Sequence, residues 1–489
     1  MPLRDKLRAL SPKPLASPPG LGNSAAHPVD LEQLDSAWPP PSPVIANETP
    51  ADRERRLEAE REAKRRNDAI EAEIEHDRQE RKKRRIDVKI ILLGQAESGK
   101  STMLRNFHLK FAPAAFQAEV AAWRAVIDLN LVRSVMYILD IVNGGASGER
   151  LGSPNLSDEM RRLRVTLSPL RTVEAALSRF LADERMAAPG AGVTAFKDAN
   201  GNVRGFDVQV ARGSKWKSLF SRNSTAQPSR EYPPGYQEVE NARRVIEACR
   251  DDMAALWAHP TVRESLVLND VALQFQSGFF LDQVDRIAAP GYEPTTDDVL
   301  KARIQTMGVE EHILKLESSA EAGQVWSIID VGGSRHQRAA WIPFFEDINM
   351  LIFLAPASAF DQTLSEDPTV NRLWDSFLIW KTVCSSRLLR NVSFILCLNK
   401  YDILDAKLKS GVQFAQHVTS YKNRPNDTEP VLLYLKDKFT SIFRQTTISH
   451  SRALHTHFTC ATDAKATALV LTRIREHIFT GNFQDADLI

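Results

Sequence analysis

The sequence has few of the features that mark secreted, membrane-spanning or metal-stapled proteins. Only four cysteines occur in 489 residues, Cys249, Cys384, Cys397 and Cys460, and no two form a Cys-x-x-Cys pair. This usage argues against a disulfide framework or a zinc site and suits a reducing compartment. The longest apolar run, Met350 to Ala355, is too short to cross a bilayer. No signal-peptide pattern opens the chain, so we expect a soluble cytoplasmic protein.

The chain also lacks an excess of charge of either sign. Its 63 basic and 62 acidic side chains leave a formal net charge of +1. Nothing in this balance indicates nucleic acid or an acidic substrate as a partner. The length predicts about three domains, by the usual domain size.

Composition divides the first 85 residues into two segments. Residues 1–50 hold 11 of the 26 prolines and few large apolar side chains, so we expect disorder there. Residues 51–85 have no glycine or proline and mix acidic with basic helix formers, which predicts one long charged helix. Leu57, Ile70 and Ile74 form its thin apolar stripe. Such a helix is either a solvated spacer or a partner-binding arm.

A buried strand followed by a glycine-rich turn stands directly after that helix. The β-branched run Ile86 to Leu93 predicts the strand, and Gly94-x4-Gly99-Lys100-Ser101 has the spacing of a phosphate-binding loop. The glycines let backbone N–H groups face phosphate oxygens, Lys100 reaches the terminal phosphates, and the Ser101 hydroxyl is suited to Mg²⁺. A helix starting near Lys100 adds its positive end to the same anion site.

The remaining periodicity predicts an α/β fold with an all-helical insert. Short apolar runs at 325–329, 350–354 and 393–398 are typical of buried parallel strands in an open, doubly wound sheet. Between the first strand and these runs, residues 108–297 show helical periodicity, interrupted by an irregular insertion at about 143–237. Within that insertion we expect a helix from Leu170 to Met186 and a hairpin about Asn200-Gly201.

Two further motifs follow predicted strands, where ligands of open α/β sheets bind. Asn399-Lys400-Tyr401-Asp402 places a carboxylate that can accept from both the N1–H and the 2-amino group of guanine. Adenine lacks that donor pair, so this motif argues against the alternative of an ATPase or kinase. Asp330-Val331-Gly332-Gly333 offers a carboxylate for Mg²⁺ and a backbone N–H for the γ-phosphate.

With these motifs the chain resembles a divergent, fungal type of α subunit of heterotrimeric G proteins. Its switch I is matched by residues 298–308, with Arg303 and Thr306, and its switch II by Asp330-Val-Gly-Gly with residues 341–346. Thr459-Cys460-Ala461-Thr462 precedes the expected last helix at 464–479. The resemblance implies a Ras-like P-loop GTPase domain, at 86–107 and 298–489, around the helical domain.

The resemblance also implies roles for individual residues. Arg303 is the arginine that stabilises charge on the transferred phosphoryl group. Ser101 and Thr306 ligate Mg²⁺, with Asp330 behind them, and Ala461 contacts the guanine edge. Contacts to GTP or GDP fall to Gly94, Glu97, Ser98, Gly99, Lys100, Ser101, Thr102, Leu300, Lys301, Ala302, Arg303, Thr306, Asp330, Val331, Gly332, Gly333, Asn399, Lys400, Asp402 and Ala461.

Two departures from the family pattern concern hydrolysis rather than binding. Ser334 stands where the family has a glutamine that orients the attacking water, and serine is too short to reach the same point. Ala96 replaces a glycine and puts a methyl group close to the γ-phosphate. We therefore expect a slow GTPase, the alternative being a GTP-binding signalling scaffold without hydrolysis.

The partners that the resemblance implies are a βγ dimer, a G-protein-coupled receptor and a downstream effector. The βγ surface would include Trp341 and the helix at 54–85, although Trp341 is equally well explained as a core residue. Residues 487–489 would contact the receptor. Met1-Pro2 lacks the glycine that myristoylation requires, and no cysteine precedes Cys249. Attachment to the inner face of the plasma membrane would then depend on partners or on the basic cluster at 81–85.

Overall fold

The computed structural model describes residues 58, 61–62, 64–65, 67–68, 86–142, 157–181, 209–210, 236–268, 273–306, 308–317, 322–448 and 452–485. It has two compact units, Met1–Arg84 and Arg85–Ile489. In the first unit the seven described residues are all helical and exposed, in line with the predicted charged helix. The predicted disorder at 1–50 and the apolar stripe of that helix lie outside the described residues, as do 487–489.

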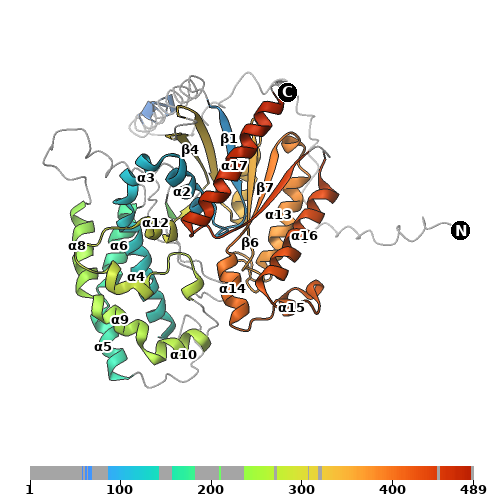
Figure 1. Ribbon diagram of the computed structural model, residues 1–489. Helices are drawn as coiled ribbons and strands as arrows, with labels where there is room; N and C mark the ends of the chain where they lie inside the picture. The colour runs from blue at the N-terminus through green and yellow to red at the C-terminus, as the bar shows by residue number, and fades with distance from the viewer. Residues whose placement is uncertain are drawn as a thin grey trace, which may run out of the picture. The chain divides into compact units, whose positions relative to one another are not determined.

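The second unit is built on a six-stranded sheet (Figure 1). In spatial order its strands are β4 (Val309–Lys315), β5 (Val325–Val331), β1 (Val88–Leu93), β6 (Met350–Pro356), β7 (Ser393–Asn399) and β8 (Leu454–Thr459). All neighbours pair in parallel except β4 and β5. The apolar runs thus correctly predicted β1, β5, β6 and β7, whereas β4 and β8 were not predicted.

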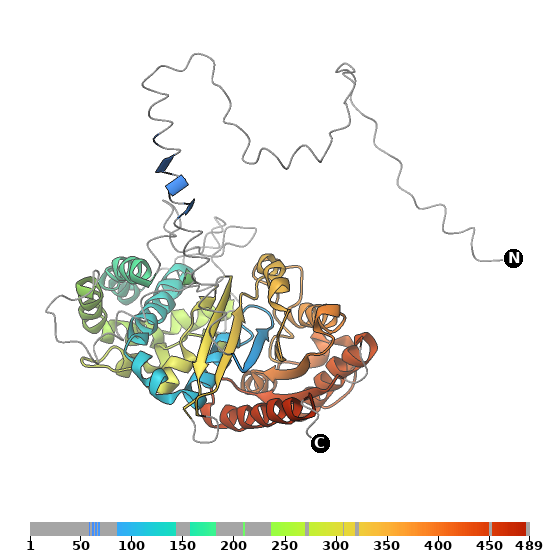
Figure 2. The same cartoon turned by 90° about the horizontal axis from the view of Figure 1, so that it is seen from above.

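Helices cover both faces of the sheet because its inner strands are apolar on both sides. Ile90 and Leu92 of β1 pack with Phe107 of α2 (Lys100–Phe111) and with α17 (Ala464–Asp485). Ile91 and Leu93 face the opposite layer. That layer contains α13 (Arg372–Cys384), α14 (Tyr401–Lys409), α15 (Phe414–His417) and α16 (Thr428–Thr446). Figure 2 shows the two layers on either side of the strands.

The segment between α2 and the later strands forms a separate helical body with its own core. Its centre is α4 (Trp123–Val142), a 20-residue helix that is buried along most of its length. Around it, in Figure 1, lie further helices. These are α3 (Pro113–Val120), α5 (Asp158–Thr166), α6 (Leu170–Leu181), α8 (Tyr236–Ala248), α9 (Arg250–Ala258), α10 (Pro260–Leu268) and α11 (Val284–Ile287). The α/β fold with a helical insert is therefore confirmed.

The insertion at 143–237 is more regular than the sequence predicted. The expected helix from Leu170 is present as α6, but α5 precedes it and was missed. α5 has only two buried apolar residues, Met160 and Leu163, because its other positions are mainly charged. The hairpin expected about Asn200-Gly201 lies outside the described residues. The two-residue strand β2 (Gln209–Val210) pairs in parallel with β3 (Gln305–Thr306).

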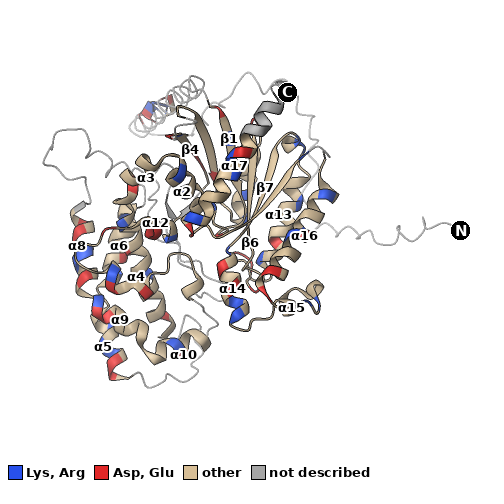
Figure 3. Ribbon diagram, viewed as in Figure 1, with Lys and Arg blue, Asp and Glu red and all other residues tan. Residues whose placement is uncertain are grey.

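The surface of the second unit carries charges of both signs. Figure 3 shows Lys and Arg interspersed with Asp and Glu along the helices. The described helices include none that is long and apolar enough to span a membrane. All four cysteines are buried and form no disulfide with one another.

Candidate functional site

The turn after β1 depends on two glycines in positive φ. Gly94 has φ 144°, and a Cβ there would lie 2.3 Å from the carbonyl oxygen of Leu354 in β6. Gly99 has φ 100° and caps α2, and its Cβ would lie 2.2 Å from Asn399 Nδ2. Both positions exclude a side chain, for conformational and steric reasons. The turn therefore holds the first N–H groups of α2 at the carboxyl edge of the sheet.

Lys100 crosses back over this turn. Its Nζ donates to the carbonyl oxygens of Gly94 (3.0 Å) and Gln95 (2.7 Å). The side chain is buried, and burial lowers the pKa of Lys100 to about 8. A cation held in this way favours a bound anion, because the anion would replace the hydration that the ammonium group has lost.

Three oxygen atoms from three segments converge beside Lys100. Ser101 Oγ donates to Asp330 Oδ2 (2.6 Å), and Thr306 Oγ1 donates to the same oxygen (3.0 Å). The two hydroxyls are 2.8 Å apart. The second carboxylate oxygen, Asp330 Oδ1, is buried without a hydrogen-bond partner among the described residues. Such a set of hard oxygen donors with one unsatisfied oxygen fits Mg²⁺.

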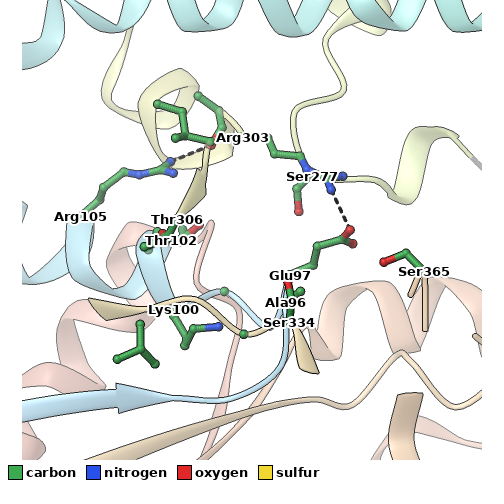
Figure 4. A pocket seen from close by; sticks show the side chains of 16 residues that line it. Ala96, Glu97, Lys100, Thr102, Arg105, Ser277, Arg303, Thr306, Ser334 and Ser365 are labelled. Atoms are coloured by element: carbon green, nitrogen blue, oxygen red, sulfur yellow. Dashed lines mark hydrogen bonds and ion pairs between the residues drawn. The ribbon is translucent and has the colours of Figure 1, made fainter. Parts of the chain in front are cut away.

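Arg303 is held by an ion pair across the pocket. Its Nη2 donates to Glu97 Oε1 at 2.7 Å (Figure 4). Arg372 of α13 approaches the other oxygen of Glu97 at 3.4 Å and donates to the carbonyl oxygen of Ala96 at 2.7 Å. The guanidinium of Arg303, followed by that of Arg372, holds the pKa of the Glu97 carboxyl well below its ordinary value. Glu97 is therefore an anion that keeps Arg303 at the mouth of the phosphate loop.

The backbone of Arg303 is fixed by the helical body. Asn130 of α4 accepts from the Arg303 N–H (2.7 Å) and donates to its carbonyl oxygen (3.1 Å). A Cβ on Gly278 would lie only 2.8 Å from Arg303 Cβ. Nearby, Arg105 of α2 donates to the carbonyl oxygens of α12 (Thr296–Lys301) and of Ala302. Neither Asn130 nor Arg105 was predicted, because each acts through backbone atoms distant in sequence.

The segment after β5 lies directly on the phosphate loop. A Cβ on Gly333 would be 2.2 Å from the backbone N of Ala96, so only glycine fits there. Ser334 and Ala96 both line the pocket, as Figure 4 shows. Trp341, in the 3₁₀ helix η6 (Arg335–Phe344), is 4% exposed and donates its Nε1–H to the Gly332 carbonyl oxygen (2.9 Å). In this conformation Trp341 is thus a core residue.

Gln95 is a buried part of the site that the sequence did not reveal. It is 1% exposed, and its Nε2 donates to the Arg372 carbonyl oxygen (2.8 Å) and to Asp375 Oδ2. Asp375 also binds Arg338 of η6 through both oxygens, at 2.9 and 2.6 Å. The carboxylate of Asp375 therefore connects the phosphate loop with the segment after Gly333.

The Asn399 motif supports the loop from the other side. Asn399 Nδ2 donates to the Ser98 carbonyl oxygen (2.8 Å), and its Oδ1 accepts from the backbone N of Ala461 (3.0 Å). Lys400 adopts φ 64° ahead of α14, and burial lowers its pKa to about 8. The carbonyl oxygen of Ala461 accepts from Asn106 of α2 (2.8 Å). The side chain of Asn399 thus joins the phosphate loop to the segment that follows β8.

Most predicted phosphate-side residues come together around a pocket of about 90 Å³. Its lining comprises Ala96, Glu97, Gly99, Lys100, Ser101, Thr102, Arg105, Ser277, Ala302, Arg303, Ile304, Thr306, Val331, Gly333, Ser334 and Ser365. Gly94, Ser98, Leu300, Lys301, Asp330, Gly332, Asn399, Lys400, Asp402 and Ala461 were also predicted but do not line it. Of these, Gly94, Ser98, Asp330 and Asn399 support the lining residues from behind.

Comparison with known proteins agrees with this geometry. The family model described as "G-protein alpha subunit" matches residues 64–478. The guanine nucleotide-binding protein alpha-4 subunit of Mycosarcoma maydis is 28% identical, over 91% of this chain and 94% of that relative. The alpha-1 subunit of the same fungus is 29% identical, over 88% and 98%. The alpha-7 subunit of Caenorhabditis elegans is 32% identical, over 51% and 68%. This chain therefore belongs to the family of G-protein α subunits.

Proposed function

We propose that this α subunit is a Mg²⁺-dependent switch between GTP and GDP that hydrolyses GTP slowly. Members of its family bind guanine nucleotides and are in general GTPases. The observation that supports magnesium dependence most directly is the contact of Ser101, Thr306 and Asp330 Oδ2 within 2.6 to 3.0 Å. Bound there, Mg²⁺ would neutralise charge on the β- and γ-phosphates. Ser101 and Thr306 would ligate it, with Asp330 behind them.

The slow rate is inferred from the residues that face the pocket. Ser334 has a short side chain and lines the same pocket as Ala96. Neither group can orient a water as a glutamine amide would. Arg303 supplies the remaining catalytic cation, but it must first leave Glu97 to reach the phosphate. We expect nucleotide binding to be retained, because Ser334 and Ala96 leave Lys100 in place.

A single-turnover assay of GTP hydrolysis with Mg²⁺ tests the proposal. We expect slow hydrolysis by the wild type, a further loss of about 10²- to 10³-fold in Arg303→Ala, and faster hydrolysis in Ser334→Gln. Arg390→Ala, at an exposed arginine directly after the 3₁₀ helix η7 (Arg387–Leu389), serves as the matched control. Tight GTP binding without hydrolysis in every variant would contradict the proposed enzyme activity. It would favour a GTP-binding signalling scaffold instead.

We further propose partners and a cellular location for this switch. Membership of the family supports a βγ dimer, a G-protein-coupled receptor and an effector as partners, at the inner face of the plasma membrane. GTP would order the segments around Thr306 and Gly333, and hydrolysis would release them and so change affinity for partners. Co-purification of the full chain with a βγ dimer in GDP, and its release on addition of a non-hydrolysable GTP analogue, measures this directly.

A further inference from the structure

Glu97 is shared by two arginines that come from different parts of the chain. It belongs to the phosphate loop, where its backbone has a φ of 59°. Its Oε1 accepts from Arg303 at 2.7 Å, and its Oε2 lies 3.4 Å from Nη1 of Arg372. Arg303 lowers the pKa of the Glu97 carboxyl more than Arg372 does, in line with its shorter distance. Because both cations are attracted by one negative charge, losing either contact strengthens the other.

Arg372 is held in place by groups other than Glu97. It is the first residue of α13, and its backbone N–H donates to the carbonyl oxygen of Gln362 (2.9 Å). Its guanidinium donates to the Ala96 carbonyl oxygen (2.7 Å) and to Gln362 Oε1 (3.1 Å). The side chain is 12% exposed. Arg372 is therefore a fixed cation beside Glu97, and it keeps two other acceptors whether or not Glu97 binds it.

Arg303, in contrast, has to move in the proposed reaction. Its side chain lines the pocket and reaches Glu97 across it (Figure 4). To stabilise charge on the transferred phosphoryl group, its guanidinium must turn toward the phosphates and give up Glu97. A Glu97 carboxylate without a second cation would then face the like charge of the phosphates, which is unfavourable. Arg372 supplies that second cation.

We propose that Arg372 is a positioning residue for GTP hydrolysis, which neutralises Glu97 and so allows Arg303 to exchange between Glu97 and the phosphate. The inference rests on the proposed function, because it concerns the arginine of that reaction. Arg372 does not belong to the described residues that line the pocket. It therefore acts through Glu97 and Arg303 rather than by contact with the nucleotide.

The proposal predicts the same direction of change for two rates. Without a positive charge at position 372, Glu97 binds Arg303 more strongly, so Arg303 turns to the phosphate less often and hydrolysis slows. The stronger pair also closes the pocket more firmly, since its partners reach each other across it. Bound GDP should then leave more slowly. A general loosening of the phosphate loop would have the opposite effect, because it would speed the release of GDP.

The test compares Arg372→Gln in two backgrounds of the full chain. Glutamine keeps an amide donor for the Ala96 carbonyl oxygen but removes the charge. Single-turnover hydrolysis of GTP and release of fluorescently labelled GDP are both measured with Mg²⁺. We expect Arg372→Gln to slow each rate about 3- to 5-fold, as for one partly exposed ionic contact, and Arg372→Lys to keep each within about 2-fold of the wild type. In a Glu97→Gln background, Arg372→Gln should change neither rate by more than about 2-fold.

The control is Lys381→Gln, which removes an exposed positive charge from the same helix and should change neither rate. Equal slowing by Arg372→Gln in both backgrounds, or faster release of GDP, overturns the proposal. Absence of hydrolysis in both the wild type and Ser334→Gln contradicts the proposed function, and the role of Arg372 in hydrolysis falls with it. Slower GDP release that depends on Glu97 would still support competition between the two arginines.

Discussion

Replacing Gln95 by alanine measures how much this side chain contributes to the contact between the phosphate loop and α13. Gln95 donates from one buried nitrogen to an ionised carboxylate, that of Asp375, and to a backbone carbonyl. A hydrogen bond to a charged group contributes about 1.5 to 3 kcal/mol, and a neutral one about 1 kcal/mol. Against this, Gln95 Oε1 is buried without a partner among the described residues, and its removal returns about 1 kcal/mol.

The net expectation is a loss of about 2 kcal/mol in the free energy that keeps the loop and the start of α13 closed. Hydrogen exchange of peptides that cover residues 94–99 and 371–377 measures this local opening. Since 1.4 kcal/mol corresponds to a factor of ten, amides protected by this contact should exchange about 30-fold faster in Gln95→Ala. Gln416→Ala, an exposed glutamine in α15, should leave exchange in both peptides unchanged.

A double-mutant cycle with Asp375→Asn separates the pair from general loosening. If Gln95 acts through Asp375, the two substitutions together should cost less than the sum of the two separate changes, by at least about 1 kcal/mol. Additive changes, or exchange within 3-fold of the wild type in Gln95→Ala, would refute the reasoning. In that case the contacts of Arg372 with the Ala96 carbonyl oxygen and with Glu97 would suffice to hold the loop to α13.

His457 of β8 and Gly99 of the phosphate loop each allow a further test. Burial, with His477 and Arg473 nearby, lowers the pKa of His457 to about 4, below its ordinary 6.5. The neutral folded form is then favoured, so stability is lost as pH falls from 6.5 toward 4. In His457→Gln, the free energy of unfolding obtained from urea titrations should fall less over that interval than in the wild type. The difference in slope should be at most about 1.4 kcal/mol per pH unit. An equal fall in both proteins would contradict this. Gly99→Ala should abolish nucleotide binding through contact with Asn399, whereas Gly291→Ala, also at positive φ but in open space, should only destabilise by about 1 kcal/mol. Nucleotide binding and thermal unfolding of both variants test the difference, and equal effects would exclude the contact.

How far the sequence predicted the fold depended on where each element lies. β6 is buried at every position, so its apolar run was recognised directly. β4 and β8 are outer strands of the sheet, and each mixes apolar with charged, His or Thr residues. Their patterns carry neither the continuous apolar run of a buried strand nor a strict alternation. α5 was missed for the same reason, because only Met160 and Leu163 are apolar and buried.

The candidate site shows a similar division. Motif spacing predicted the residues whose roles are local, such as Gly94, Gly99 and Lys100, because the conformation of the turn itself requires them. It did not predict partners brought together by the tertiary fold. Gln95 and Asp375 are 280 residues apart, and Arg105 and Ala302 are 197 apart. No periodicity links such positions, since each contact depends on how separate elements pack.

The departures at Ala96 and Ser334 look independent in the sequence, but the structure makes them neighbours. The backbone N of Ala96 lies so close to Gly333 that a Cβ there would be only 2.2 Å away, and Ser334 follows directly. A side chain longer than serine at 334 must therefore share the pocket with the Ala96 methyl group. A glutamine restored at 334 alone would have to fit in this pocket beside Ala96. We expect its benefit to hydrolysis to be fully realised only when residue 96 is glycine as well, because the two positions enclose the same space.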